Sequence, residues 1–474
     1  MLKILKNKNI LYILLSVGFF LIINAVNIYY YVKANYIAGW DGFGHVAISY
    51  AYHNEVFPHI FGNIKVWFNG MPFSHFYPPL FYVTTSFLAF VKDQALFVNL
   101  FKIFNISMLI VTVIGFYFLA LEFLKSKEKA LVANMVFVLL LSTYKKFGDL
   151  GISVESVFNY GFLPQSFSFI FLILFLIFFN KESTVKNRIL SLLSLLCVAI
   201  SNIHVLFIAV FYICTYHAYL LYTKDFIELK KKMIDCSLAG LISLFWFLPM
   251  FYYYQFSGAK SSNYGGFEFI DNYLIISMIF SAISVYIAHK EKNKKIAILA
   301  LYIFIISTCN YLPLTELIVS IPLHVKRWII APILLLPILS LYIINKNKIL
   351  KGIGFIALIT VFFTYIFSVP QQNMLGYFTT AAQDEFQPML DWIIANKKDS
   401  DLINVESAYI GDVSDFWYIH AALGMSGVNT TYAILRESSV MSFAFATIRN
   451  SISTDQEAIG TKFNLFGQNK KRNY

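Results

Sequence analysis

The residues best suited to acid–base chemistry lie in a polar segment near the start of the chain, residues 38–82. This segment is AGWDGFGHVAISYAYHNEVFPHIFGNIKVWFNGMPFSHFYPPLFY, and it contains an isolated acid, Asp41, and four of the nine histidines. His45 follows Asp41 by four residues, so both side chains share one face if a helix begins near residue 41. A carboxylate in such a position can act as a general base. The alternative is that Asp41 caps the helix, because Asp is a favoured N-cap residue.

The same segment contains a candidate site for a divalent metal. Asp41, His45 and His53 have the spacing i, i+4, i+12 and are all residue types that bind metals, although nothing in the sequence fixes their geometry. The alternative is that His45 is an interfacial histidine in an aromatic-rich loop. Further candidates for lining a pocket are Glu155, His204, and the neighbouring pair His75 and Tyr77.

The composition indicates that membrane-embedded helices must position these residues. Hydrophobic residues make up 58% of the chain, charged residues only 13%, and the mean hydropathy is +0.65, which excludes an ordinary soluble protein. Because irregular backbone cannot face lipid, we expect an all-α polytopic membrane protein of about 11–13 transmembrane helices. The candidate spans are 10–32, 97–121, 129–144, 163–180, 187–203, 204–222, 234–254, 272–288, 296–311, 328–345 and 351–370.

The net charge of +11 does not indicate nucleic-acid binding, because the basic residues gather in short links between alternate spans. This is the positive-inside pattern. It predicts a plasma-membrane protein with a cytoplasmic N-terminus and with external segments at 33–76, 145–162, 255–270, 312–327 and beyond 370. Residues 77–92, which open with Pro78 and Pro79, are expected to be a short interfacial or re-entrant piece.

After Pro370 the composition becomes more polar, with an amphipathic helix near 385–397 and a strand-like run near 402–410. We therefore expect a transmembrane domain at residues 1–370, with its first external loop at 33–76. A small external α/β domain is expected at residues 371–474. The chain stops at GQNKKRNY without an obvious final element, and truncation of this domain is one interpretation.

Four short patterns resemble the membrane-embedded glycosyltransferases of the GT-C superfamily. The first is WDGFGH, an early external Asp followed four residues later by His. The second is NGMPFSHFYPPLFY, a G-x-P-x-x-x-x-Y-P-P-L block. The third is SNIHVLF, with His204 at the outer end of a helix, followed later by FWFLPMFYY. The fourth is HVKRWIIAP, in which Lys326 and Arg327 open a late helix.

The resemblance covers most of residues 1–440. It is closest to the archaeal and bacterial membrane proteins labelled "6-pyruvoyl-tetrahydropterin synthase-related", a label that does not describe their chemistry. The WWDYG motif of oligosaccharyltransferases is missing, and so is the DE pair of protein O-mannosyltransferases, since Gly42 follows Asp41. Both of these subfamilies are therefore poor fits.

The resemblance implies an enzyme that moves a sugar from a polyprenyl-phosphate carrier to an acceptor at the outer membrane face. Asp41 would be the base and His45 would assist it, while Arg327 would bind the donor phosphate through its planar fork and Lys326 would add a point charge. The expected substrate-binding residues are Arg327, Lys326, His204, Glu155, His75 and Tyr77. The expected partners are a polyprenyl-phosphate-linked sugar, membrane lipids, and a glycan, lipid or protein acceptor.

Other functions remain open at this stage. The basic pair at residues 326–327 would also suit snorkelling toward lipid headgroups. A transporter would need charged or broken helices near the bilayer midplane and an internal repeat, which the sequence does not show. A non-catalytic GT-C-like scaffold or subunit would keep the same architecture and bind a partner through its external domain.

Overall fold

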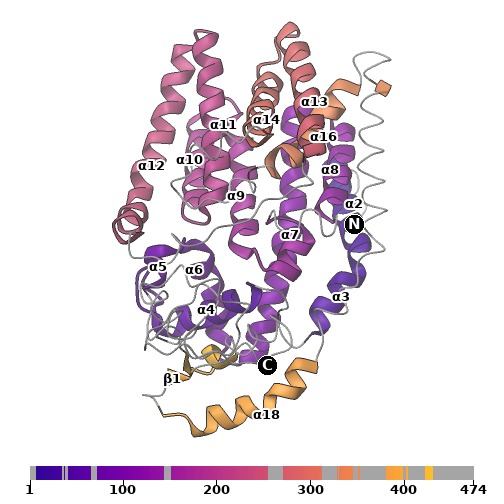
Figure 1. Cartoon of the computed structure of the whole chain (residues 1–474). Helices are drawn as coiled ribbons and strands as arrows, with labels where there is room; N and C mark the ends of the chain where they lie inside the picture. The colour runs from indigo at the N-terminus through magenta and orange to yellow at the C-terminus, as the bar shows by residue number, and fades with distance from the viewer. Residues whose placement is uncertain are drawn as a thin grey trace, which may run out of the picture. The chain divides into compact units, whose positions relative to one another are not determined.

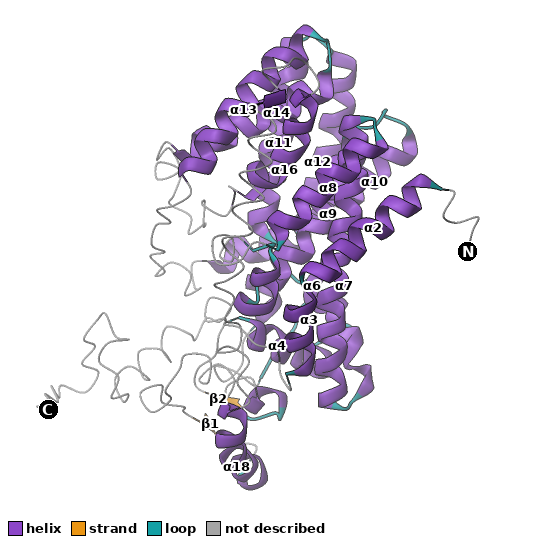
Figure 2. Cartoon of the chain, turned by 90° about the vertical axis from the view of Figure 1, so that its right-hand side faces the viewer, coloured by secondary structure: helices purple, strands orange, loops and turns teal. Residues whose placement is uncertain are grey.

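The computed structural model describes residues 7–34, 37, 41–65, 72–142, 151–254, 271–311, 328, 330–344, 351–352, 381–398, 402–403 and 422–430. These residues are mostly helical, as the sequence predicts (Figures 1 and 2). The elements are α2 (Lys8–Ile23), α3 (Ala25–Lys33), α4 (Gly42–Glu55), α5 (Phe73–Phe76), α6 (Leu80–Ser86), η1 (Phe87–Val91), α7 (Gln94–Leu124), α8 (Lys127–Leu141), η3 (Ser156–Tyr160), α9 (Leu163–Phe179), α10 (Val185–Ala199), α11 (Ile203–Tyr222), α12 (Phe226–Tyr254), α13 (Asp271–Lys290), α14 (Lys294–Tyr311), α16 (Ile330–Ile344), α18 (Ala381–Asn396), β1 (Leu402–Ile403) and β2 (Asn429–Thr430).

Within the described residues, three helices are long and apolar enough to cross a membrane: Gln94–Leu124, Ile203–Tyr222 and Phe226–Tyr252. The bent pair α2 and α3 adds a fourth if it forms one span. Four shorter apolar helices, Leu80–Val91, Leu163–Phe179, Leu274–Lys290 and Ile330–Ile344, have 10–17 residues. A 12-residue helix is about 18 Å long, well short of the hydrocarbon thickness. Leu80–Val91 therefore matches the short piece expected at 77–92, while the full count of spans stays a prediction.

The first apolar segment differs from the single helix expected at 10–32. It breaks at Asn24, where α2 and α3 are bent by 66°. The Asn24 side chain is 1% exposed and donates from Nδ2 to the Phe20 carbonyl at 2.9 Å and to the Ser142 hydroxyl at 2.8 Å. A polar side chain that reaches into the backbone ladder and to a neighbouring helix is a recognised cause of kinks.

The chain divides into two compact units. Unit 1 contains Met1–Tyr30, Ile103–Phe245 and Asn263–Met374, and unit 2 contains Tyr31–Lys102, Trp246–Ser262 and Leu375–Tyr474. This division groups the first loop with the C-terminal segment. The domain boundary expected at residue 370 lies outside the described residues and stays a prediction.

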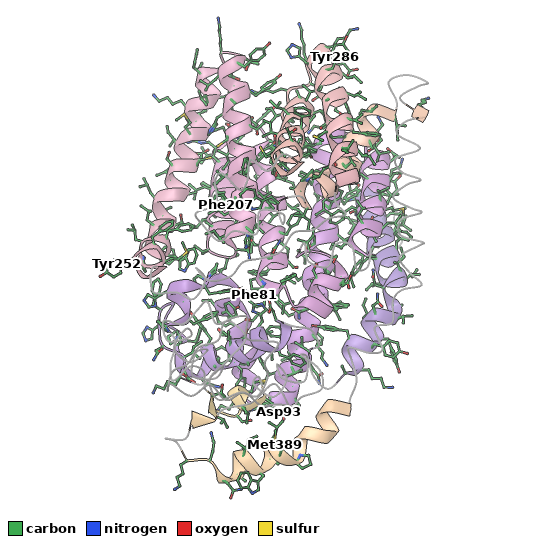
Figure 3. All side chains as sticks on the ribbon, in the orientation of Figure 1. Phe81, Asp93, Phe207, Tyr252, Tyr286 and Met389 are labelled. Atoms are coloured by element: carbon green, nitrogen blue, oxygen red, sulfur yellow. The ribbon has the colours of Figure 1, made fainter. Side chains whose placement is uncertain are left out.

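Unit 1 is a helical bundle in which neighbours in sequence pack as hairpins, such as α9 with α10 and α13 with α14 (Figure 1). Aromatic contacts fill the bundle, including the stacked rings of Phe116 and Phe137 at 3.9 Å. Many apolar side chains of unit 1 remain exposed, for example Tyr286 at 70% (Figure 3). A helix bundle that meets lipid needs such apolar outer faces.

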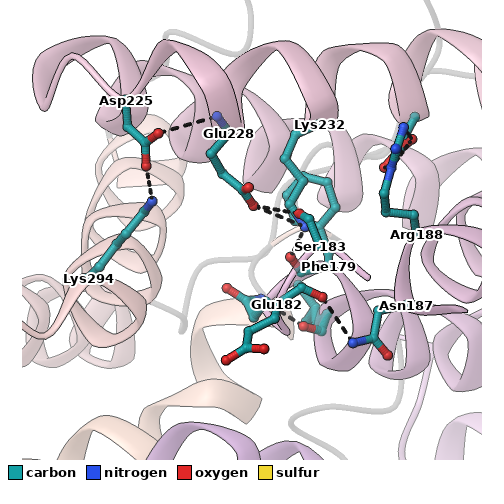
Figure 4. Close-up of polar contacts among 12 residues, drawn as sticks. Phe179, Glu182, Ser183, Asn187, Arg188, Asp225, Glu228, Lys232 and Lys294 are labelled. Atoms are coloured by element: carbon teal, nitrogen blue, oxygen red, sulfur yellow. Dashed lines mark hydrogen bonds and ion pairs between the residues drawn. The ribbon is translucent and has the colours of Figure 1, made fainter. Parts of the chain in front are cut away.

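Charged side chains join the ends of four unit 1 helices (Figure 4). Arg188 of α10 donates hydrogen bonds from Nε and Nη2 to both oxygens of the buried Asp235 carboxylate on α12. Lys232 of α12 is 2% exposed and donates to the Phe179 carbonyl at the end of α9 at 2.6 Å. Lys294 pairs with Asp225 at 2.9 Å. These contacts lie in and beside the basic links that the positive-inside pattern places in the cytoplasm.

Unit 2 packs short helices α4, α5 and α6 around aromatic side chains. Trp246, in the C-terminal third of α12, is fully buried and donates from Nε1 to the Ser74 carbonyl at 2.9 Å. In the C-terminal part, α18 confirms the helix expected near 385–397, and β1 begins where the strand-like run was expected. Strands β1 and β2 pair in parallel, with Leu402 opposite Asn429. A complete α/β domain at residues 371–474 stays a prediction, since most of that range lies outside the described residues.

Candidate functional site

Helix α4 begins where the sequence predicts, with Asp41 at its N-cap position. The backbone of Asp41 is helical (φ −92°, ψ −15°), and its carbonyl accepts the first helical hydrogen bond from the His45 amide at 3.0 Å. The Asp41 side chain makes no capping hydrogen bond. Capping therefore does not explain an acid at this position, and the partly exposed carboxylate lies at the positive end of the helix dipole.

His45 lies one turn into α4 and is enclosed by aromatic rings. Its side chain is 1% exposed, and the ring centroids of Phe81, Tyr82 and Tyr77 lie at 5.9, 5.8 and 6.3 Å from that of His45. Nδ1 of His45 is hydrogen-bonded to the Tyr82 hydroxyl at 2.6 Å. Burial lowers the pKa of His45 from its ordinary 6.5 to about 3, so the ring is neutral at physiological pH. A neutral, enclosed imidazole orients neighbouring groups rather than supplying a cation for phosphate.

A second pair of polar contacts holds α4 against α6. The Ser49 hydroxyl donates to the His45 carbonyl at 2.7 Å and lies 2.7 Å from the Thr85 hydroxyl. All of these groups are buried. Because buried polar groups without partners are costly, this arrangement fixes how α4 is rotated relative to α6. It thereby fixes the direction in which the N-terminal end of α4, and Asp41 with it, is presented.

His75 and Tyr77 lie in the same unit as His45. The Tyr77 ring stacks on Phe73 at 5.3 Å and is the most distant of the three rings around His45. His75 is half-buried and packs against Phe61 at 5.0 Å. The G-x-P-x-x-x-x-Y-P-P-L block thus supplies part of the His45 surroundings, through Tyr77 and the residues that follow Pro79.

The candidate metal site does not form. Asp41, His45 and His53 are all described, and no group of three His, Cys, Asp or Glu side chains in the described part of the chain is placed to bind a metal. The His45 Nδ1 is engaged by Tyr82, and the His53 ring lies edge-on to Phe90 at 4.6 Å and stacks on Phe57. His53 therefore belongs to an aromatic cluster. The metal site suggested by the spacing i, i+4, i+12 was wrong because the sequence does not show these aromatic neighbours.

Glu155 lies in unit 1, in a buried polar turn that the sequence analysis only partly identified. Glu155 is 4% exposed and immediately precedes the π-helix η3. The Ser156 hydroxyl accepts from the amides of Gly151 at 3.1 Å and Ser153 at 3.2 Å, and the Ser166 hydroxyl donates to the Gly151 carbonyl at 2.7 Å. Gly151 has φ +89°, and a Cβ there would collide with the Gln165 side chain. The Gly-x-Ser-x-Glu-Ser sequence was the available signal, and π-turns recur at functional sites.

His204 also lies in unit 1, at the first turn of α11, as expected. Asn202 caps this helix, because its Oδ1 accepts from the amides of His204 at 3.0 Å and Val205 at 3.2 Å. The preceding helix α10 ends at Ala199, so residues 200–202 form a short link between the two helices, close to the junction expected between the spans 187–203 and 204–222. The His204 backbone is therefore fixed in the first turn of α11.

The structure brings Asp41, His45, His75 and Tyr77 into one unit, and it places Glu155 and His204 in the other. Lys326 and Arg327 lie outside the described residues. The expectation that all of these residues line one cavity beneath an external domain stays a prediction.

Comparisons with known proteins support the fold class. No family model matches the chain, and no curated protein matches it. The chain has a GT-C fold, the class to which archaeal oligosaccharyltransferases belong. The oligosaccharyltransferase of Archaeoglobus fulgidus in its apo form superposes with a TM-score of 0.57 and 11% identity, over 90% of this chain and 65% of that chain.

Two further structures of the same enzyme give similar values. One, tethered to an acceptor peptide with an NVT sequon, has a TM-score of 0.56, 12% identity, and coverage of 90% of this chain and 64% of that chain. The other, named AglB and in complex with an inhibitory peptide and a dolichol-phosphate, has a TM-score of 0.55, 12% identity, and coverage of 91% and 65%. The chain thus spans about 65% of the length of these neighbours, and at this identity the likeness concerns the fold alone.

Proposed function

We propose that this chain is a membrane-embedded glycosyltransferase that moves a sugar from a polyprenyl-phosphate carrier to an acceptor at the external membrane face. The main support for this proposal is the position of Asp41. Its carboxylate lies at the start of α4 without capping it, and the buried His45–Tyr82 pair follows one turn later. The GT-C fold adds support, since a neighbour with this fold has been seen with a dolichol-phosphate.

In the proposed reaction, the acceptor nucleophile gives its proton to the Asp41 carboxylate as its oxygen or nitrogen attacks the anomeric carbon of the donor sugar. The bond between this carbon and the phosphate oxygen breaks, and its electron pair stays on the phosphate. Arg327 and Lys326 stabilise the negative charge that develops there. The products are the glycosylated acceptor, the polyprenyl phosphate and a proton held by Asp41.

His45 acts as a positioning residue in this proposal. It is too enclosed to contact a phosphate in the described arrangement, being 1% exposed. Its hydrogen bond to Tyr82, with the Ser49–Thr85 contact one turn further along, holds the α4 end that carries Asp41. His204, Glu155, His75 and Tyr77 are proposed to line the site.

The test is turnover of purified protein in lipid nanodiscs with a panel of polyprenyl-phosphate hexoses. Asp41→Asn keeps size and hydrogen bonding but removes the base, so turnover should fall by about 10²–10⁴-fold with little change in donor binding. Asp93→Asn is the matched control. Asp93 is an exposed acid that accepts from the Leu96 amide at 2.7 Å, and Asn preserves this cap. The control should turn over donor like the wild type.

Arg327 is tested in the same assay. Loss of a charge-assisted contact costs about 1.5–3 kcal/mol, so Arg327→Ala should weaken donor binding by roughly 10- to 150-fold. Arg327→Lys should restore only part of this, because lysine lacks the planar fork. Mild and equal effects of Asp41→Asn and Arg327→Ala would refute the catalytic proposal and favour the non-catalytic scaffold.

A further inference from the structure

Unit 2 contains a cavity of about 610 Å³ whose described lining includes none of the residues proposed above for catalysis or donor binding. Four segments form its walls: the end of α3 with Ala34, the first turns of α7, one face of α18, and residues 422–426. Its volume is within the range of small-molecule sites. Figure 3 labels two residues close to these walls in sequence, Asp93 just before α7 and Met389 on α18.

Side chains bonded to backbone carbonyls hold these walls together. Gln94 of α7 donates from Nε2 to the Met425 carbonyl at 2.9 Å. Lys397, just beyond α18, donates to the Ser426 carbonyl at 3.0 Å. Lys102 is 1% exposed and donates to the Ala34 carbonyl. Each segment of the wall is thus tied to another part of unit 2, and a ligand would meet a largely formed site.

The cavity lies at the polar end of a long helix. Helix α7 has 31 residues, so it is about 46 Å long and exceeds the hydrocarbon thickness by about 16 Å. Gln94, Asn99 and Lys102 fall in its N-terminal third, and Gln94 and Asn99 are exposed. Exposed carboxamides are costly in hydrocarbon, so this end of α7 belongs in the aqueous phase. A water-soluble ligand can reach it.

The lining chemistry points to a neutral, hydroxyl-rich ligand. One cation, Lys33, and one anion, Asp391, leave the described lining without net charge, which disfavours a dedicated phosphate site. The lining includes the carboxamide of Asn99, which can both donate and accept, that of Gln94, whose Nε2 also bonds the Met425 carbonyl, and the hydroxyl of Ser426. Sugar hydroxyls are likewise both donors and acceptors. We propose that this cavity binds a neutral carbohydrate and, resting on the function proposed above, that it is the acceptor subsite.

The experiment is calorimetric titration of the full chain in nanodiscs, without donor. The probes are maltotriose, mannotriose and triacetylchitotriose, together with a blocked Ala-Asn-Thr peptide and inorganic phosphate. At least one trisaccharide should bind. Asn99→Leu and Asp391→Asn should each weaken this binding about tenfold, the usual worth of one or two hydrogen bonds. Asp93→Asn, outside the cavity lining, should bind like the wild type. Thermal unfolding of each variant checks that the fold persists.

The outcomes separate this inference from the proposed function. Failure of all three trisaccharides to bind, or equal binding by the wild type and both cavity variants, overturns the carbohydrate site. Peptide binding that depends on Asn99 and Asp391, without sugar binding, also overturns it, in favour of a peptide acceptor. If the protein binds a trisaccharide but turns over no donor, the proposed enzyme function and the acceptor role are both refuted. The carbohydrate-binding site itself is then still supported. Asp41→Asn should bind the trisaccharide unchanged while turnover falls.

Discussion

Acidification should destabilise unit 2 through His45, and the size of the effect follows from its burial. The pKa of this ring falls from 6.5 to about 3 on folding because the enclosed site penalises the charged form. Between these values the opened state binds a proton that the folded state does not. Stability is therefore full above about pH 6.5 and is lost as the pH falls toward 3. From pH 7 to pH 5 the loss works out at about 2 kcal/mol.

Amide hydrogen exchange of peptides that cover α4 and α6 measures this directly, once the rates are corrected for the intrinsic pH dependence of exchange. The free energy of opening should fall by about 2 kcal/mol in the wild type between pH 7 and pH 5. His45→Phe removes the titrating ring, so its opening energy should be lower throughout but nearly independent of pH. His59→Gln, at an exposed histidine, should behave like the wild type. A His45→Phe variant that keeps the full pH dependence would refute the assignment to His45.

Three other predictions test the membrane-embedded part. Asn24→Leu removes the hydrogen bond that joins α2 to α8, so it should lower stability by about 1–2 kcal/mol in thermal unfolding, and an unchanged melting temperature would show that the bend has another cause. Arg188→Ala leaves the buried Asp235 carboxylate without its guanidinium partner and should lower the free energy of unfolding by about 1–3 kcal/mol. The double variant Arg188→Met/Asp235→Leu should recover much of this loss, and a double variant no more stable than Arg188→Ala would contradict the account. The topology is tested with single cysteines introduced at Ile60 or Asn293 in a cysteine-free background. An impermeant reagent added from outside should label the cysteine at position 60 but not the one at position 293. Labelling at position 293 alone would show that the orientation is the reverse of the predicted one.

The sequence was a good guide where local signals determine structure. The start of α4 beside Asp41 follows from the apolar run after that residue, and the start of α11 follows from Asn202, which caps the helix just before His204. The short piece Leu80–Val91 follows from Pro78 and Pro79 and from its length. These features depend on residues within a few positions of one another, and the sequence displays such residues directly.

Features that depend on distant partners were not predicted. The burial of His45 arises from Tyr77, Phe81 and Tyr82, more than thirty residues away, so the sequence did not show that this candidate metal ligand is an enclosed neutral ring. The bend at Asn24 depends on Ser142, 118 residues away. One polar residue in an apolar run cannot reveal whether it bends the helix or merely packs against a neighbour.

The central claim is that a polyprenyl phosphate binds beside Asp41. Its most direct test is an electron cryo-microscopy structure of the protein in nanodiscs with a short-chain polyprenyl phosphate. We predict phosphate density in contact with Arg327, on the same membrane face as Asp41, with the Asp41 carboxylate facing the space that the donor sugar would occupy. Phosphate density on the opposite face from Asp41, or at a site that Asp41 does not border, would contradict the account.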